Sequence, residues 1–189
     1  MARLDRYTDQ ERKEILDAME MVKLETVEPI IFWGTLLGAV REKGFIAHDD
    51  DIDFAYISKY HTIEEVQKEL YEVYKELDDK GWLKKIFAIG EIVCELPPKE
   101  RFKGRGQCHF AVGKGYFDLF TLWFDENGEL QSYPLINLGR SYLPLMEYEL
   151  YDRKFKSISN AESFLARVYG AWRIPSKEKS KKKHYVLLK

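Results

Sequence analysis

A run of acidic residues leading into an apolar segment is the part of this sequence best suited to chemistry. Residues 49–53 read Asp-Asp-Asp-Ile-Asp and lead into Phe-Ala-Tyr-Ile, which is typical of a β-strand. Because alternate side chains of a strand share one face, Asp51 and Asp53 point the same way, about 6–7 Å apart at Cα. Two such carboxylates repel each other unless a cation lies between them, and hard oxygen ligands favour Mg²⁺ or Mn²⁺. Alone, this run would be interpreted as a solvated acidic turn, but the preceding segment favours a metal site.

That preceding segment has features of a phosphate-binding turn. A short apolar strand is predicted over residues 30–33, Gly34 permits a tight turn, and Thr35 leads into a helix predicted over residues 36–43. The free N–H groups and the dipole of a helix N-terminus favour an anion, and Gly38 would allow a phosphate to approach closely. A phosphate site beside a metal-binding strand is what phosphoryl or nucleotidyl transfer requires.

A third carboxylate, Asp118, stands alone among the aromatic and apolar residues of 116–120. A lone buried carboxylate is costly unless it is paired or bound to metal. We therefore expect Asp118 on a strand next to the one that carries Asp51 and Asp53, although a surface position is the alternative. His109, on the preceding predicted strand, is expected to be a core residue with satisfied hydrogen bonds.

The remaining pattern predicts an α+β fold with a mixed, mostly antiparallel sheet flanked by helices. A helix is expected after Thr8, which precedes Glu11 in a capping-box arrangement, and another after Thr62, and a last one capped by Ser159 and Glu162. Strands are expected at 52–57, 84–89, 107–112 and 116–123, and a short pair at 148–150 and 154–156. Residues 113–115 join two of these strands as a hairpin, and residues 96–106 form a loop.

Length and composition fit one domain over residues 1–175 followed by a basic tail over 176–189. The chain has 189 residues, of which 45% are hydrophobic, so a core can form. The net charge of −2 gives no overall attraction to nucleic acid, and no stable nucleic-acid partner is expected. Two cysteines fit neither a zinc site nor a secreted disulfide scaffold. Without a signal-peptide pattern or an apolar run of about 20 residues, we expect a cytoplasmic protein with no transmembrane segment.

Three blocks of the sequence resemble the LicD family, a branch of the nucleotidyltransferase superfamily that includes phosphorylcholine transferases and fukutin-type polyol-phosphate transferases. The first and most specific block joins Gly-Thr-Leu-Leu-Gly-Ala-Val-Arg at 34–41 to the acidic run at 49–53. The second is Tyr-Phe-Asp-Leu-Phe at 116–120, and the third is Tyr-Gly-Ala-Trp at 169–172, followed by Pro175.

The resemblance implies a nucleotidyltransferase-like fold and a reaction. A phospho-alcohol of the phosphocholine, ribitol-phosphate or glycerol-phosphate type would pass from a CDP-linked donor to a glycan hydroxyl, which could be lipid-linked, with release of CMP. Asp51 and Asp53 would bind Mg²⁺ or Mn²⁺, and Asp118 would bind a metal ion or accept the proton of the acceptor hydroxyl. Gly34, Thr35 and Gly38 would lie at the phosphates, with Arg41 and His48 as further contacts.

Three other functions compete with this one. A nucleotidyltransferase would use the same carboxylates to transfer NMP from an NTP to a small molecule, a protein or RNA. A catalytically inactive nucleotide-binding module would not need three costly carboxylates. A glycosyltransferase with an Asp-x-Asp metal site would normally have a larger nucleotide-binding sheet before the motif. The long block at 34–53 favours the transfer of a phospho-alcohol.

Overall fold

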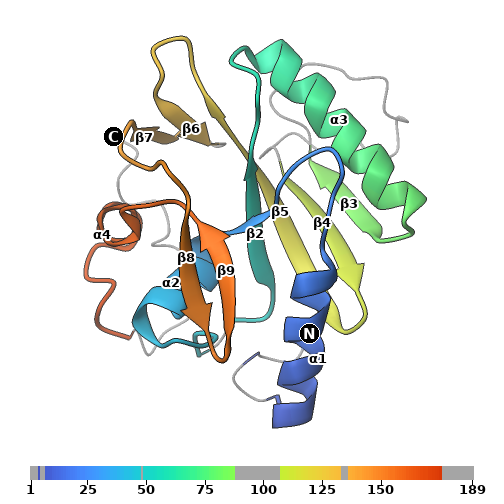
Figure 1. Ribbon diagram of the computed structural model, residues 1–189, viewed down its shortest axis with the longest axis vertical. Coiled ribbons are helices and arrows are strands. Elements are labelled where there is room, and N and C mark those ends of the chain that lie inside the picture. Colours follow the sequence, from blue (N-terminus) through green and yellow to red (C-terminus); the bar gives the residue numbers. More distant parts are fainter. Residues whose placement is uncertain (1–3, 5–6, 48, 88–106, 133–135, 176–189) are drawn as a thin grey trace.

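The computed structural model describes residues 4, 7–47, 49–87, 107–132 and 136–175. Figure 1 shows a twisted central sheet with helices on both sides. The helices are α1 (Asp9–Met21), α2 (Trp33–Arg41), α3 (Ile63–Asp79) and α4 (Ala161–Tyr169). The strands of the sheet are β1 (Ile30–Ile31), β2 (Ile52–Ile57), β3 (Leu83–Phe87), β4 (Gln107–Val112), β5 (Gly115–Phe124), β6 (Leu130–Ser132) and β7 (Ile136–Gly139).

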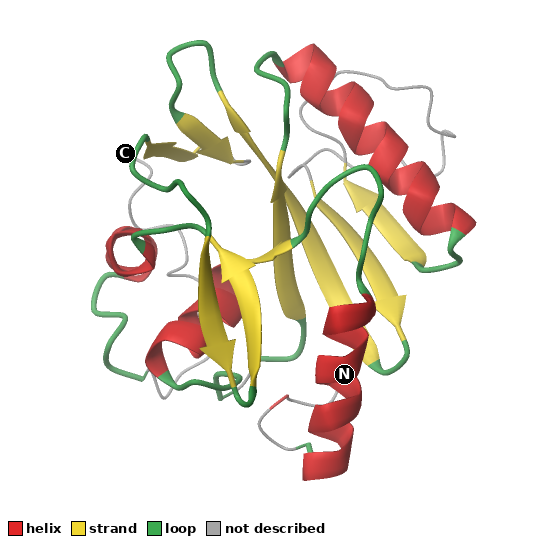
Figure 2. Cartoon of the chain, viewed as in Figure 1, coloured by secondary structure: helices red, strands yellow, loops and turns green. Residues whose placement is uncertain are grey.

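The sheet is mixed and mostly antiparallel, as predicted. Its order is β1-β2-β5-β4-β3, and β6 pairs with the far part of β5 and with β7. The pair β2–β5 is parallel, and every other pair described in this sheet is antiparallel. A separate hairpin, β8 (Met146–Leu150) and β9 (Arg153–Ser157), packs against α2 and β1. Figure 2 shows this hairpin in front of the main sheet.

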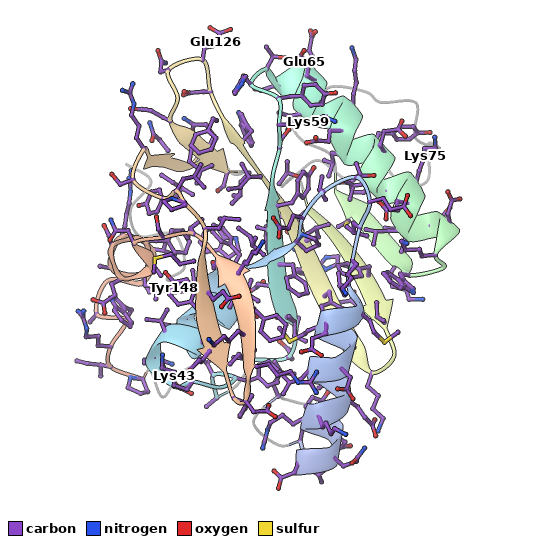
Figure 3. The ribbon with its side chains drawn as sticks, in the orientation of Figure 1. Lys43, Lys59, Glu65, Lys75, Glu126 and Tyr148 are labelled. Carbon is purple, nitrogen blue, oxygen red and sulfur yellow. The ribbon has the colours of Figure 1, made fainter. Side chains whose placement is uncertain are left out.

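The two faces of the sheet have different roles. Alternate residues of β2, β4 and β5 turn aromatic side chains to one face, where Phe54, Phe110 and Phe117 stack in the core. Helix α1 contacts β4 and β5, and α3 contacts β3. The other face carries the carboxylates and is covered by α2, whose Trp33 packs against Phe120. Charged residues such as Lys43, Lys75 and Glu126 project outward at the periphery (Figure 3).

Helix capping follows the sequence in two cases out of three. Thr8 forms the predicted capping box with Glu11, and the Thr62 hydroxyl accepts a hydrogen bond from the Glu65 amide. The predicted Ser159 cap of the last helix is wrong. Asn160, in the left-handed region at φ 53°, is the N-cap and makes no side-chain capping bond. The Ser159 hydroxyl instead donates to the Ser141 carbonyl, which ties the helix entry to the preceding loop.

In the structure, the strand predicted at 30–33 is shorter than expected, and the helix predicted at 36–43 begins and ends earlier than expected. β1 ends at Ile31, and α2 begins at Trp33 and ends at Arg41. The reversal occurs at Trp33, whose φ of 35° is unusual for a residue with a side chain. Packing of Trp33 against Phe32 and Phe164 holds this conformation. Gly34 and Thr35 therefore lie in the first turn of the helix rather than before it.

Other predicted elements agree with the structure or fall outside it. The strand at 52–57, the hairpin turn at 113–115 and the pairing of 148–150 with 154–156 are confirmed. The strand predicted at 84–89 is described over Leu83–Phe87. The predicted loop at 96–106 and the basic tail at 176–189 lie outside the described residues, so the division at residue 175 stays a prediction.

Candidate functional site

The parallel pairing of β2 with β5 brings the predicted carboxylates together. Asp53 lies opposite Asp118 in the register of the two strands. Asp51 precedes β2 directly, and its charge and that of Asp118 affect each other. Three carboxylates that are as much as 67 positions apart in sequence thus share one face of the sheet.

The electrostatics of this cluster favour a bound cation. Burial raises the pKa of Asp53 well above its usual value, and the charges of Asp51, Asp49 and Asp118 raise it further. The pKa of Asp51 is raised to about 6, mainly by burial and to a smaller extent by the charges of Asp118 and Asp50. Holding these groups ionised together is therefore unfavourable unless a positive charge compensates.

Asp49, which the sequence analysis did not include in the site, also belongs to this cluster. Ligand oxygens of Asp49, Asp50 and Asp51 lie within 4.8 Å of one another. Asp49 and Asp53 converge over Gly34, where a methyl group would lie 2.9 Å from Asp49 Oδ2 and 3.0 Å from Asp53 Oδ2. This donor set of carboxylate oxygens is of the kind that Mg²⁺ and Mn²⁺ accept, so the residues present fit a divalent ion. The position of Asp49, only four residues before Asp53, is the feature of the sequence that could have indicated its place in this cluster.

Gly34 and Thr35 attach α2 to the carboxylate strand. The Gly34 amide donates to Asp53 Oδ2 over 2.8 Å, and the Asp53 amide donates to the Thr35 hydroxyl over 2.9 Å. Thr35 is only 1% exposed. In this structure the first turn of α2 therefore fixes Asp53 directly, whereas the sequence analysis assigned it only to a phosphate. Phosphate binding by these two residues stays a prediction.

The structure shows packing contacts of Gly38 and Arg41, and their predicted contacts with phosphate stay predictions. A methyl group at Gly38 would lie 2.3 Å from the Gly44 carbonyl oxygen, so the close approach at Gly38 is made by the chain itself. Arg41 donates to the Trp172 carbonyl over 2.9 Å and pairs with Glu42. Its side chain is 13% exposed. His48 lies outside the described residues.

Gln107 and His109 are site residues that the sequence analysis missed. Gln107 Nε2 donates to Asp118 Oδ2, and His109 Nδ1 contacts Asp118 Oδ1. His109 was expected to be a core residue, yet its side chain is 18% exposed beside the carboxylates. The hairpin turn at 113–115 contained the signal, because counting outward from it places His109 opposite Asp118.

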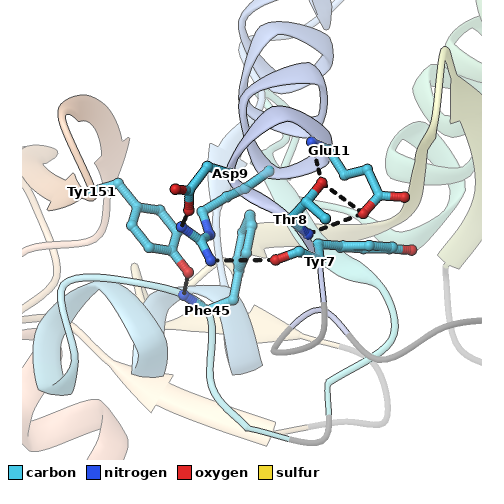
Figure 4. A network of polar contacts seen from close by, with 7 residues as sticks. Tyr7, Thr8, Asp9, Glu11, Phe45 and Tyr151 are labelled. Atoms are coloured by element: carbon cyan, nitrogen blue, oxygen red, sulfur yellow. Dashed lines mark hydrogen bonds and ion pairs between the residues drawn. The ribbon is translucent and has the colours of Figure 1, made fainter.

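The loop that leads to the acidic run is braced from two sides. The Phe45 amide donates to the Tyr151 hydroxyl over 3.1 Å, and the Tyr151 amide donates to the Lys43 carbonyl over 2.6 Å. The Tyr151 ring also lies under the Arg12 guanidinium of α1, with 4.9 Å between its centroid and the Arg12 Cζ atom (Figure 4). A methyl group at Gly44 would lie 2.9 Å from this ring, so Gly44 is required for packing.

The N-terminal segment contacts the acidic run itself. The Leu4 amide donates to the Asp49 carbonyl over 2.7 Å. Arg12 also donates to the Tyr7 carbonyl and to Asp9 (Figure 4). Residues that are distant in sequence from the carboxylates thus fix the path of the backbone that carries them.

Comparisons with known proteins agree with the resemblance seen in the sequence. Residues 27–94 match the family model described as LicD/FKTN/FKRP, nucleotidyltransferase domain. The matched segment contains β1, α2, β2 and the acidic run, so the LicD resemblance and the nucleotidyltransferase fold class are confirmed. The match supports a transferase.

Two further comparisons add little about activity. No curated protein matches the sequence significantly. Among solved structures, the lincomycin-bound crystal structure of the lincosamide antibiotic adenylyltransferase LnuA is similar, with 21% sequence identity and a TM-score of 0.45. That similarity covers 84% of each chain. Within the described residues, no helix is long and apolar enough to cross a membrane.

Proposed function

We propose that this protein is a metal-dependent transferase that moves a phospho-alcohol from a CDP-linked donor to a glycan hydroxyl. The observation that carries the proposal is the convergence of Asp49, Asp51 and Asp53 next to Asp118, within and beside the segment that matches the LicD family model. The phosphocholine, ribitol-phosphate and glycerol-phosphate types of donor all suit this assignment.

In the proposed reaction the acceptor oxygen attacks the phosphorus atom that bears the alcohol. The bond from that phosphorus to the bridging oxygen breaks, and CMP leaves with the bonding electron pair. A divalent ion, Mg²⁺ or Mn²⁺, would neutralise charge on the phosphates when bound. Asp51 and Asp53 would hold that ion.

Asp118 has two roles consistent with its position. It would either complete the ligand set opposite Asp53 or accept the proton that the acceptor hydroxyl loses. In both roles its carboxylate must lie close to those of Asp51 and Asp53. Asp49 joins the proposed ligands because its carboxylate converges with that of Asp53 over Gly34.

A thermal-shift screen tests the donor class. The ligands are CDP-choline, CDP-ribitol, CDP-glycerol, CMP and the four NTPs, each with and without Mg²⁺ or Mn²⁺. A ligand that binds only the folded protein raises the melting temperature, by an amount equivalent to about 2.7 kcal/mol at 100 times its Kd. We expect metal-dependent stabilisation by one CDP-alcohol, and this result would also name the alcohol.

Two variants make the screen specific for the carboxylate site. Asp51→Asn should abolish the metal-dependent shift, whereas Asp78→Asn, at an exposed position on α3, should leave it unchanged. Stabilisation by an NTP alone would favour transfer of a nucleotidyl group, with attack at the α-phosphorus and release of pyrophosphate. If no nucleotide stabilises the protein, the transferase proposal fails and an inactive binding module becomes the better hypothesis.

A further inference from the structure

Both oxygens of Asp118 are held by side chains of the neighbouring strand. On β4, Gln107 and His109 alternate with apolar residues and therefore share the face on which Asp118 lies. His109 is directly opposite Asp118 in the antiparallel register, and Gln107 is opposite Phe120. The two donors reach different oxygens, Oδ2 and Oδ1, so the plane of the carboxylate is fixed by two contacts rather than one.

Gln107 is a costly residue to bury without a purpose. It is 5% exposed, and an amide buried without hydrogen-bond partners costs roughly 1–3 kcal/mol in proteins. Cys108 and Phe110, on the opposite face of the same strand, are fully buried and pack in the core. Since the β4 backbone is already paired on both sides by β3 and β5, the Gln107 amide is not needed to build the sheet.

The two contacts leave Asp118 able to bind a further partner. A carboxylate has about four lone-pair positions, and each oxygen uses one of them for its β4 donor. Asp53 and Asp51 lie on the other side of β5 from these donors, because β5 separates β4 from β2. The remaining acceptor capacity of Asp118 is therefore the part that can act together with the β2 carboxylates.

We propose that Gln107 and His109 are positioning residues that hold the Asp118 carboxylate in a geometry that binds a divalent ion together with Asp51 and Asp53. Outer partners of this kind fix the orientation of a metal-binding carboxylate, and their loss typically weakens metal affinity by about 10–100-fold. The inference rests on the proposed function for the metal site, but it does not depend on which donor or acceptor the enzyme uses.

The test is direct titration of the metal-free full chain with Mn²⁺, followed by the electron paramagnetic resonance signal of free Mn²⁺. Gln107→Met keeps the length of the side chain but cannot donate, and we expect it to raise the Kd by about tenfold or more. The matched control is Gln131→Met. Gln131, on β6, makes the same kind of bond, because its side-chain amide donates to the Asp125 carboxylate over 2.7 Å. That control should leave the Kd unchanged.

A second pair of variants covers the case in which Gln107→Met does not fold. His109→Phe removes the donor to Asp118, whereas His109→Asn retains a side-chain N–H in a similar position. We expect His109→Phe to weaken Mn²⁺ binding by about tenfold and His109→Asn to restore most of the loss. A purely structural role would make the effects follow the melting temperatures of the variants instead.

The outcomes separate this inference from the proposed function. If folded Gln107→Met and His109→Phe bind Mn²⁺ as the unmodified protein does while Asp51→Asn does not, the positioning inference is overturned and the metal site stands. If the variants lose affinity but no nucleotide donor is ever bound, the inference stands and the proposed reaction fails. If the unmodified protein binds no Mn²⁺, both are overturned.

Discussion

The substitution Gly34→Ala would disturb the geometry of the carboxylate site while it leaves the stability of α2 almost unchanged. Gly34 lies in the first turn of α2, and its backbone is not in the left-handed region, so Gly34→Ala is compatible with the helix. Alanine is favoured over glycine within a helix by up to about 1 kcal/mol, so the fold itself would lose little. The new methyl group would, however, lie 2.9 Å from Asp49 Oδ2 and 3.0 Å from Asp53 Oδ2.

The two carboxylates must therefore retreat by roughly 0.5 Å to restore ordinary contact distances. This movement also weakens the bond from the Gly34 amide to Asp53, which is 2.8 Å long. Misplacement of catalytic groups by about 1 Å can cost about 100-fold in rate. We expect Gly34→Ala to lower kcat/KM by about 10–100-fold, equivalent to about 1.4–2.7 kcal/mol of transition-state stabilisation.

The assay compares Mn²⁺ affinity, transfer rate and unfolding free energy for Gly34→Ala and for a control. Gly81→Ala is suitable because φ at Gly81 is 68° and no atom of the described residues lies within 4 Å of the new methyl group. That control should lose about 1 kcal/mol of stability and keep its metal affinity and rate. A Gly34→Ala protein with unchanged Mn²⁺ affinity and rate would refute the view that Gly34 is required by the converging carboxylates.

Two further predictions concern pH and the braced loop. The folded pKa of Asp51, about 6, is above its unfolded value, so this carboxyl binds more protons in the folded metal-free protein and its contribution to stability falls as pH rises from about 4 to 6. The loss is about 3 kcal/mol. It should appear in urea unfolding as a pH-dependent difference in stability between the unmodified protein and Asp51→Asn. Saturating Mg²⁺ should remove this pH dependence. A difference that does not vary with pH would contradict the shift. Tyr151→Phe leaves the Phe45 amide without its acceptor and should cost about 1–3 kcal/mol by urea denaturation, whereas an unchanged midpoint would show that the Tyr151 hydroxyl does not brace the loop.

The sequence alone was enough to predict the elements whose signals are local. The strand that carries Asp53 follows from alternating side chains, and the capping box of Thr8 and Glu11 follows from their spacing. The placement of Asp118 beside Asp53 was also predictable in kind, because a lone carboxylate in an apolar strand requires compensation. These inferences depend on residues within a few positions of one another or on a cost that any fold must meet.

Tertiary structure decided the partners of those residues. The sequence contains no local signal that Tyr151 would hold the loop at Phe45, or that Gly38 would be required by the Gly44 carbonyl. The conformation of Trp33 is held by packing against Phe164, from a helix more than 100 residues away. Periodicity specifies which face of an element a side chain occupies, but contacts between elements depend on how the elements pack. The chemistry of the acidic cluster was therefore predictable from the sequence, whereas the bracing that sets its geometry required the folded chain.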